Sequence, residues 1–119
     1  MLVVDDEPDA RQIINQLLRF HAIACDTVAD AEVAVQMLAS GHYDAVVIDL
    51  ALPVMHGWEL VRQIRSNPET AALRCIAITA YHTSMIRHEA FEMGFSAYFP
   101  KPLDEYNFVH ELLRLMAIE

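Results

Sequence analysis

A carboxylate at the end of an apolar run is the residue in this sequence that points most clearly to chemistry. Asp49 ends the third such run, and a carboxylate buried there is costly unless polar groups surround it. Polar residues follow three other apolar runs as well: Asp5 and Asp6 follow the first, Thr79 the fourth and Lys101 the fifth. Their common place at the ends of apolar runs predicts one shared site.

These residue types together suit the transfer of a phosphoryl group. Three carboxylates in one pocket repel one another, which raised pKa values or a bound cation would relieve, and oxygen ligands suit Mg²⁺. Lys101 would add a positive charge and Thr79 a hydroxyl donor, so Asp49 would be the nucleophile and an aspartyl phosphate the product. Each residue alone has an ordinary explanation, such as a turn or a helix cap for an Asp, but the joint pattern favours function.

Short apolar runs alternate along the chain with longer stretches of helical period. The apolar runs predict strands at 2–4, 23–25, 45–48, 75–78 and 97–99. The periodic stretches predict helices at 8–20, about 29–39, about 58–66, about 84–93, and from just after Pro102 to the C-terminus. The side chains expected to face inward are, in the first helix, Ala10, Ile13, Ile14, Leu17 and Leu18 and, in the last, Val109, Leu112, Leu113 and Met116.

The alternation of strands and helices predicts an α/β fold in one domain, 1–119. Its parallel sheet would be covered by helices on both faces. The continuous apolar run at 45–48 fits a strand that is buried on both sides. In open parallel sheets, functional residues collect at the carboxyl ends of the strands, near the point where the strand order reverses. The five polar residues all fall at such strand ends.

The composition excludes several classes of protein. The 119 residues are 55% apolar, enough for a sizeable core, and a net charge of −9 argues against direct nucleic-acid binding. No apolar run reaches the roughly 18 residues of a membrane span, and the acidic cluster near the start is unlike a signal peptide. Cys25 and Cys75 lack metal-ligand spacing, so we expect buried free thiols in a reducing, cytoplasmic setting. The six histidines are expected at the surface, with His56 and His82 in loops beside the site.

Four segments of the chain resemble the motifs of the response regulator receiver domain, the phosphoacceptor module of two-component signalling. They are Val3-Val4-Asp5-Asp6-Glu7-Pro8, Val47-Ile48-Asp49-Leu50 with Pro53 and Gly57, Ile78-Thr79-Ala80, and Phe99-Pro100-Lys101-Pro102. The resemblance covers essentially the whole chain and includes the chemotaxis regulators. It implies a flavodoxin-like (βα)5 fold with a doubly wound sheet and strand order 2-1-3-4-5. It also implies a signalling module, which catalyses only its own phosphorylation and dephosphorylation, rather than an enzyme.

The resemblance implies a role for each site residue. Asp49 would accept the phosphoryl group from a histidine kinase or a histidine phosphotransfer protein. Asp6 would bind Mg²⁺ directly and Asp5 mainly through water, with Asp49 and the backbone carbonyl of Ala51 as further ligands; Mn²⁺ could substitute. Lys101 would pair with the phosphoryl oxygens.

A conformational switch is implied as well. Thr79 would hydrogen-bond a phosphoryl oxygen, and the ring of Tyr98 would turn inward as Thr79 moves. Pro102 resembles the family's cis-peptide proline, which would aim the preceding lysine inward. Ala80 would leave room for the phosphoryl group, and Gly57 would allow a tight or left-handed turn.

Two positions that flank the phosphoryl group in this family carry less common choices. Ala51 cannot hydrogen-bond an attacking water, whereas Tyr81 could cover the site or orient water. We expect this pair to set the lifetime of the phosphoryl group. Leu52 replaces the family's most frequent methionine with a side chain of similar volume, which changes little.

Other classes fit the sequence less well. A haloacid-dehalogenase-like phosphotransferase would need a second Asp at position 51, where this chain has Ala51. A flavodoxin-like cofactor binder would need a Ser/Thr/Gly-rich phosphate loop after the first strand, where this chain is acidic. A degenerate receiver used only for docking does not fit an intact set of site residues.

The sequence leaves the partners open. A downstream output domain or protein is expected, but neither it nor the cognate kinase is identified, and the chain suits either a stand-alone regulator or a piece of a larger protein such as a hybrid kinase. A second apolar set in the last helix would mark a partner or homodimer surface, on the face of the fourth helix, fifth strand and fifth helix, or be buried at the chain end: Tyr106, Phe108, Leu115 and Ile118. No contact with nucleic acid or membrane is expected.

Overall fold

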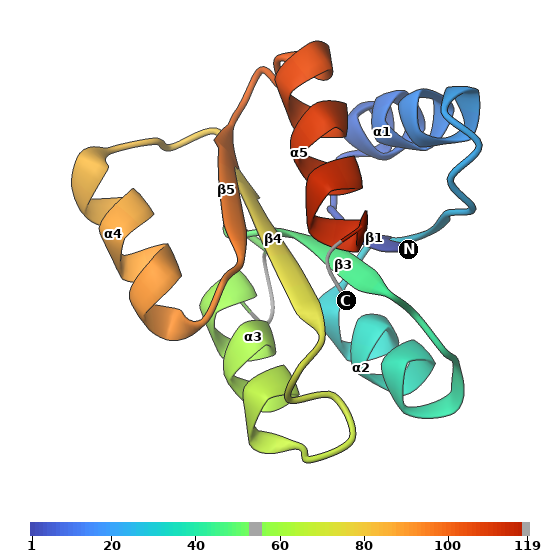
Figure 1. The fold of residues 1–119 in the computed structure, drawn as a ribbon. Helices are drawn as coiled ribbons and strands as arrows, with labels where there is room; N and C mark the ends of the chain where they lie inside the picture. The colour runs from blue at the N-terminus through green and yellow to red at the C-terminus, as the bar shows by residue number, and fades with distance from the viewer. Residues whose placement is uncertain (53–55, 118–119) are drawn as a thin grey trace.

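The computed structural model describes residues 1–52 and 56–117, in which strands and helices alternate along the chain (Figure 1). The strands are β1 Leu2–Val4, β2 Asp26–Val28, β3 Ala45–Asp49, β4 Arg74–Thr79 and β5 Ala97–Pro100. The helices are α1 Pro8–Phe20, α2 Ala31–Ser40, α3 Gly57–Ser66, α4 Ser84–Met93 and α5 Glu105–Ala117. Pro53 and Ile118 lie outside the described residues.

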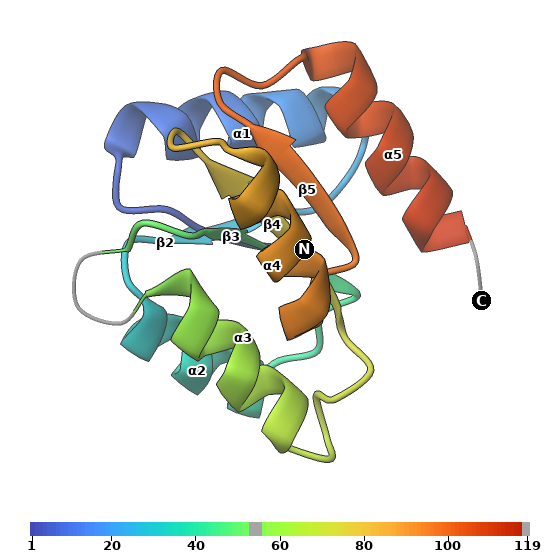
Figure 2. The same ribbon diagram turned by 90° about the vertical axis from the view of Figure 1, so that its left-hand side faces the viewer.

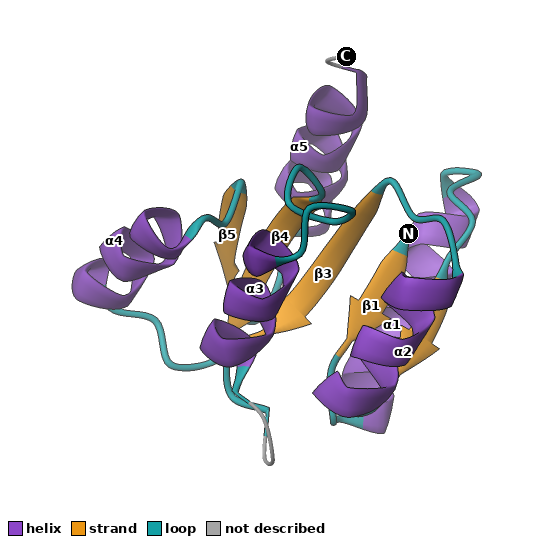
Figure 3. Cartoon of the chain, turned by 90° about the horizontal axis from the view of Figure 1, so that it is seen from below, coloured by secondary structure: helices purple, strands orange, loops and turns teal. Residues whose placement is uncertain are grey.

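The described strands form one parallel sheet in the order β2-β1-β3-β4-β5 (Figure 3). The register pairs Val4 of β1 with Ile48 of β3, and Asp49 of β3 with Ile78 of β4. The strand order reverses between β1 and β3, so the carboxyl ends of these two strands lie side by side where a doubly wound sheet places its site. The predicted fold and strand order are confirmed.

Two apolar clusters cover the two faces of the sheet. Leu2 and Val4 of β1 pack with α2, α3 and α4, whereas Val3 packs with α1 and α5. Figure 2 shows α1 and α5 on one side of the sheet and α2 and α3 on the other. Successive strand residues point to opposite faces, so a strand covered on both sides needs apolar residues without interruption. No helix among the described residues has the length and apolarity to cross a membrane.

The second strand is the element that the sequence placed wrongly. It was predicted at 23–25, but β2 begins at Asp26, whose N–H donates to the carbonyl of Met1. Ile23 and Cys25 are indeed buried, in the cluster beneath α1 and α5. These two residues belong to a loop, and their side chains are buried in the core. The residues of β2 follow them and pair with β1 at the edge of the sheet. In this segment the apolar side chains therefore indicate which residues are buried, but not which residues form the strand.

The apolar stripe of α5 also differs from the prediction. Phe108, expected in the second apolar set, is fully buried and packs edge-on against Phe99, with ring centroids 5.1 Å apart. Leu113, predicted to face inward, is exposed, as is Ile13 of α1. The buried stripe of α5 runs through Phe108, Val109 and Leu112, and this phase turns Leu113 to the solvent.

Capping residues fix the ends of two helices. The side chain of Asp30 accepts the N–H of Val33 at 2.9 Å at the start of α2, and Thr83 accepts the N–H of Ile86 at 3.0 Å at the start of α4. Gly94 ends α4 with φ of 109°, a left-handed conformation that glycine adopts without strain. Thr83 thereby sets where the loop that follows β4 must end.

A single arginine joins three segments at the amino edge of the sheet. The guanidinium of Arg65, in the last turn of α3, donates to the carbonyl of Gly94 at 2.6 and 3.1 Å. It also donates to the carbonyls of Leu73 at 2.6 Å and Ala71 at 3.1 Å. These contacts fasten the ends of α3 and α4 to the start of β4.

Candidate functional site

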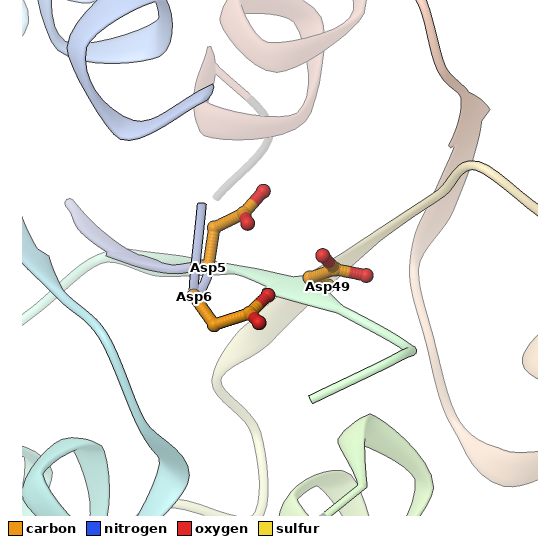
Figure 4. A group of neighbouring side chains, drawn as sticks. All are labelled: Asp5, Asp6 and Asp49. Atoms are coloured by element: carbon orange, nitrogen blue, oxygen red, sulfur yellow. The ribbon is translucent and has the colours of Figure 1, made fainter. Parts of the chain in front are cut away.

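Three aspartates converge at the carboxyl edge of the sheet, where their side chains lie close together (Figure 4). Asp5 and Asp6 follow β1, and Asp49 ends the neighbouring β3. Each offers a carboxylate oxygen, and these oxygens all lie within 4.8 Å of one another. Asp5 and Asp49 are buried and Asp6 is exposed, so the cluster opens to solvent on the Asp6 side.

Both carboxylate oxygens of Asp49 have protein partners. Oδ1 accepts the backbone N–H of Ala51 at 2.9 Å, and Oδ2 accepts a hydrogen bond from Lys101 Nζ at 3.2 Å. The chain turns sharply after this residue, and α3 comes back close to it. A Cβ at Gly57 would lie 2.7 Å from the Asp49 carbonyl oxygen, so glycine is required there by close approach, and not by the left-handed turn that the sequence allowed.

Asp5 is the most deeply buried carboxylate of the site. Its Oδ2 accepts from Lys101 at 2.8 Å, and its Oδ1 accepts the N–H of Glu7 at 3.0 Å. Burial raises the pKa of Asp5 above its ordinary value and the charge of Asp49 adds to this, while the hydrogen bonds from Lys101 and Glu7 oppose it. A cation at the cluster would therefore be bound in part by relieving the cost of burying Asp5.

Lys101 is the cation that binds this acidic cluster together. It pairs with Asp5, with Asp49 and also, at 3.0 Å, with Glu7. Burial disfavours its ammonium form, but the hydrogen bonds to Asp5 and Glu7 and the charge of Asp49 outweigh burial and raise its pKa. The Lys101–Pro102 peptide bond is cis, as the resemblance implied. The sequence assigned no role to Glu7, although its place two residues after Asp5 in an acidic cluster was a signal.

Thr79 and Tyr98 lie on β4 and β5, the two strands that follow β3 in the sheet. Thr79 is buried, and its Oγ1 accepts the N–H of Tyr81 at 3.0 Å. Tyr98 is also buried, and its hydroxyl lies 2.8 Å from Nδ1 of His82. The centroids of the two rings lie 5.5 Å apart. His82 is an exposed loop residue as predicted, but its contact with Tyr98 was not anticipated.

An open hollow lies beside Thr79, on the α4 side of the site. Ala51 and Tyr81, the pair expected to flank a phosphoryl group, both line this hollow, and Tyr81 is 70% exposed. The other lining residues are Leu50, His56, Trp58, Thr79, Ile86 and Glu89. Thr79, although buried, therefore lies along the wall of a hollow that opens to solvent on this side.

The donor set fits a divalent cation that prefers oxygen. The cluster contributes the carboxylates of Asp5, Asp6 and Asp49, and Asp6 is open to solvent, so a bound ion could keep waters. With Glu7 the local formal charge is −4, against +1 from Lys101, so a divalent ion would reduce a net charge of −3 to −1. No cysteine or histidine belongs to this cluster, which favours Mg²⁺ or Mn²⁺ over softer metals.

Comparisons of sequence agree with this geometry. A family model for the response regulator receiver domain matches residues 1–113. An uncharacterized 14.6 kDa protein in the sodA1 3′ region of Leptolyngbya boryana is 34% identical over 116 residues, which cover 98% of this chain and 86% of that protein. Response regulator MprA of Mycolicibacterium vanbaalenii is 32% identical over 102 residues; the match covers 86% of this chain but only 43% of MprA, less than half its length.

Solved structures agree as well. A protein from Chloroflexus aurantiacus J-10-fl assigned as a response regulator superposes with a TM-score of 0.93 at 27% identity, covering 98% of this chain and 95% of that one. The receiver domain of sensor histidine kinase PA1611 from Pseudomonas aeruginosa superposes with a TM-score of 0.89 at 29% identity, with 98% and 95% coverage. The latter holds a magnesium ion coordinated in its active site cleft.

Proposed function

The chain belongs to the response regulator receiver domain family, and from this premise we propose that it is a phosphoacceptor, which takes a phosphoryl group onto Asp49 and reports it through Thr79 and Tyr98. Receiver domains are signalling modules rather than enzymes in the ordinary sense. The observation that carries the proposal is the position of Lys101 Nζ, within hydrogen-bond distance of both Asp5 and Asp49. A cation there suits charge that develops on a phosphoryl group attached to Asp49.

The proposed reaction is a single group transfer. A carboxylate oxygen of Asp49 forms a bond to phosphorus as the bond from phosphorus to the donor breaks, and the bonding electron pair leaves with the donor. The donor group is a histidine imidazole of a kinase or phosphotransfer protein, or the acetate of acetyl phosphate. Lys101 donates to the phosphoryl oxygens, and a divalent cation held by Asp5, Asp6 and Asp49, with the Ala51 carbonyl as a further ligand, supplies additional positive charge when bound.

The response to phosphorylation would begin at Thr79. Its contact with the Tyr81 N–H uses Oγ1 as an acceptor, which leaves the hydroxyl hydrogen for a phosphoryl oxygen. A shift of Thr79 toward that oxygen would move the loop that follows β4, and His82 in this loop is hydrogen-bonded to Tyr98. The modification would thus bias a two-state equilibrium of the loop and the ring.

The lifetime of the aspartyl phosphate is proposed to depend on Ala51 and Tyr81. Ala51 offers no side-chain group that could orient water, while the largely exposed Tyr81 lines the hollow beside Thr79. The test is to exchange both residues for polar or small ones and to follow loss of the phosphoryl group after the donor is removed. An unchanged rate of dephosphorylation would refute this part of the proposal.

The partners that we propose follow from the same role. A histidine kinase or histidine phosphotransfer protein supplies the phosphoryl group, and a separate output domain or protein responds to it. Exposed apolar side chains on α4 and α5 suit a protein contact or a homodimer on that face: Met85, Phe91 and Tyr106. Cys25 and Cys75 are buried free thiols, which fits the proposed cytoplasmic location.

The decisive experiment is phosphorylation by a small donor. The protein is incubated with acetyl phosphate and Mg²⁺, and its intact mass is measured for the wild type and Asp49→Asn. We expect the wild type to gain the mass of one phosphoryl group and the variant to gain none. The proposal fails if the folded wild type stays unmodified, or if the variant is modified equally.

A further inference from the structure

The ammonium group of Lys101 has all of its hydrogen-bond donors in use. A lysine ammonium carries three N–H donors. Nζ contacts Asp5 Oδ2 at 2.8 Å, Glu7 Oε1 at 3.0 Å and Asp49 Oδ2 at 3.2 Å. A phosphoryl oxygen on Asp49 can therefore gain a hydrogen bond from Lys101 only by displacing one of these acceptors.

Glu7 is the partner that is easiest to displace. Its side chain is 63% exposed, against 0% for Asp5 and 6% for Asp49. Water can solvate the carboxylate of Glu7 when it leaves Lys101, whereas Asp5 would be left buried and charged without its cation. Of the two carboxylates that keep their charge after transfer to Asp49, Glu7 is therefore the one that can leave Lys101 at the lower cost.

We propose that Glu7 is a positioning residue that holds Lys101 away from an incoming phosphoryl group and so slows phosphorylation of Asp49. This inference rests on the proposed phosphoacceptor function. Glu7 acts in two ways: it competes for one donor of Lys101, and its negative charge repels an anionic donor at the mouth of the site. Both effects weaken when the charge of this one side chain is removed, since a neutral acceptor binds an ammonium less strongly than a carboxylate does.

The structure separates this role from a structural one. Glu7 precedes α1, but its side chain makes no capping hydrogen bond there. Its backbone N–H binds Asp5 Oδ1 and its carbonyl accepts the N–H of Arg11, and neither contact needs the carboxylate. The variant Glu7→Gln therefore keeps the shape and the backbone contacts and removes the charge.

The experiment compares Glu7→Gln with Glu69→Gln. Glu69 is exposed in the segment between α3 and β4, which leads into the amino end of β4, opposite the carboxyl edge that carries the site, so its variant removes the same charge elsewhere. Phosphorylation rates with acetyl phosphate are measured at saturating Mg²⁺, so that a changed metal affinity does not alter the rate. Affinity for beryllofluoride, a phosphoryl mimic, is measured in parallel, and the thermal midpoint serves as a check on folding.

We expect Glu7→Gln to be phosphorylated about two- to fivefold faster than the wild type, the size expected for loss of one exposed ionic contact, and to bind beryllofluoride more tightly. Glu69→Gln should match the wild type in both assays. The inference is overturned if Glu7→Gln reacts no faster than Glu69→Gln, or more slowly than the wild type. Absence of phosphorylation in the wild type would instead refute the proposed function, so the two failures are distinguishable.

Discussion

Two cationic side chains lie at opposite edges of the same sheet and bind opposite kinds of partner. Lys101, at the carboxyl edge, pairs with the charged carboxylates of Asp5, Glu7 and Asp49. Arg65, at the amino edge, donates only to neutral backbone carbonyls, those of Ala71, Leu73 and Gly94, in the contacts described above. One cation is placed among groups that repel one another, and the other among groups that have no charge to balance.

This difference in partners suggests that the carboxyl edge, with Lys101, serves reactivity and that the amino edge, with Arg65, serves stability. The carboxylates held together around Lys101 repel one another, so a cation that relieves this repulsion binds favourably and the contacts at this edge can change. Of the carbonyls around Arg65, that of Gly94 directly follows the end of α4, and those of Ala71 and Leu73 belong to the segment between α3 and β4. Arg65 supplies a hydrogen-bond partner to each of them. We therefore expect substitutions at the two edges to have different and nearly independent effects.

Replacing Lys101 should give the largest effect and test the reactive edge. In Lys101→Met the apolar stem is kept and the ammonium is lost, and we expect phosphorylation by acetyl phosphate to slow by about 100-fold or more. The rate is measured by intact mass at saturating Mg²⁺. A rate within a few-fold of the wild type would show that Lys101 is not needed for the transfer. The proposed reactive role of the carboxyl edge would then be contradicted.

Replacing Arg65 tests the stabilising edge. Arg65→Ala leaves three carbonyls without this partner, and we expect the free energy of unfolding in urea to fall by about 2–4 kcal/mol. Phosphorylation by acetyl phosphate, measured where the variant is fully folded, should stay within about twofold of the wild type because the two edges share no contact. A large loss of phosphorylation without a loss of stability would contradict the proposed division.

Binding of a divalent cation is expected to distinguish the two edges of the sheet. Because an ion that binds only the folded state stabilises it, Mg²⁺ at about 100 times its dissociation constant should add about 2.7 kcal/mol to the free energy of unfolding. We expect the same increment in Arg65→Ala as in the wild type, and a much smaller one in Asp6→Asn. Equal increments in wild type and Asp6→Asn would place the ion elsewhere.

The smallest effect is expected at a thiol near Arg65. Burial raises the pKa of Cys75 to about 11, while the nearby charge of Arg65 opposes this. Since the ordinary pKa is 9.0, the folded state binds this proton more tightly, so the contribution to stability is complete below pH 9 and is lost as pH rises toward 11. In a Cys25→Ala background, Cys75 should react with iodoacetamide only as the protein opens, faster in Arg65→Ala but not in Lys101→Met. Equal acceleration in both variants would contradict the prediction.

Much of the site is predictable from the sequence because a parallel sheet brings strand ends together. Asp5, Asp49 and Thr79 each end or follow a buried apolar run, so topology alone places them at one edge. Which side of a helix faces the core is harder to predict from the sequence. Phe108 and Leu113 are both apolar, and only the packing of α5 on β5 decides that Phe108 is buried.

The contacts of long side chains were not predictable. Glu7 reaches Lys101 and Arg65 reaches Gly94 across 94 and 29 positions of sequence. His82 meets Tyr98 because the loop after β4 turns toward β5. Residue spacing specifies the backbone position of such groups but not which of several rotamers they adopt, so these partners emerge only from the packed structure.

The hollow beside Thr79 also gives the protein an optical probe. Trp58, the one tryptophan of the chain, lines this hollow in the first turn of α3 and packs edge-on against Phe95, with ring centroids 6.4 Å apart. An indole that is half-buried in this hollow changes its emission when charge or water nearby changes. Occupation of the site by a metal ion or a phosphoryl group can therefore be followed in the unlabelled protein, by fluorescence excited at the indole band.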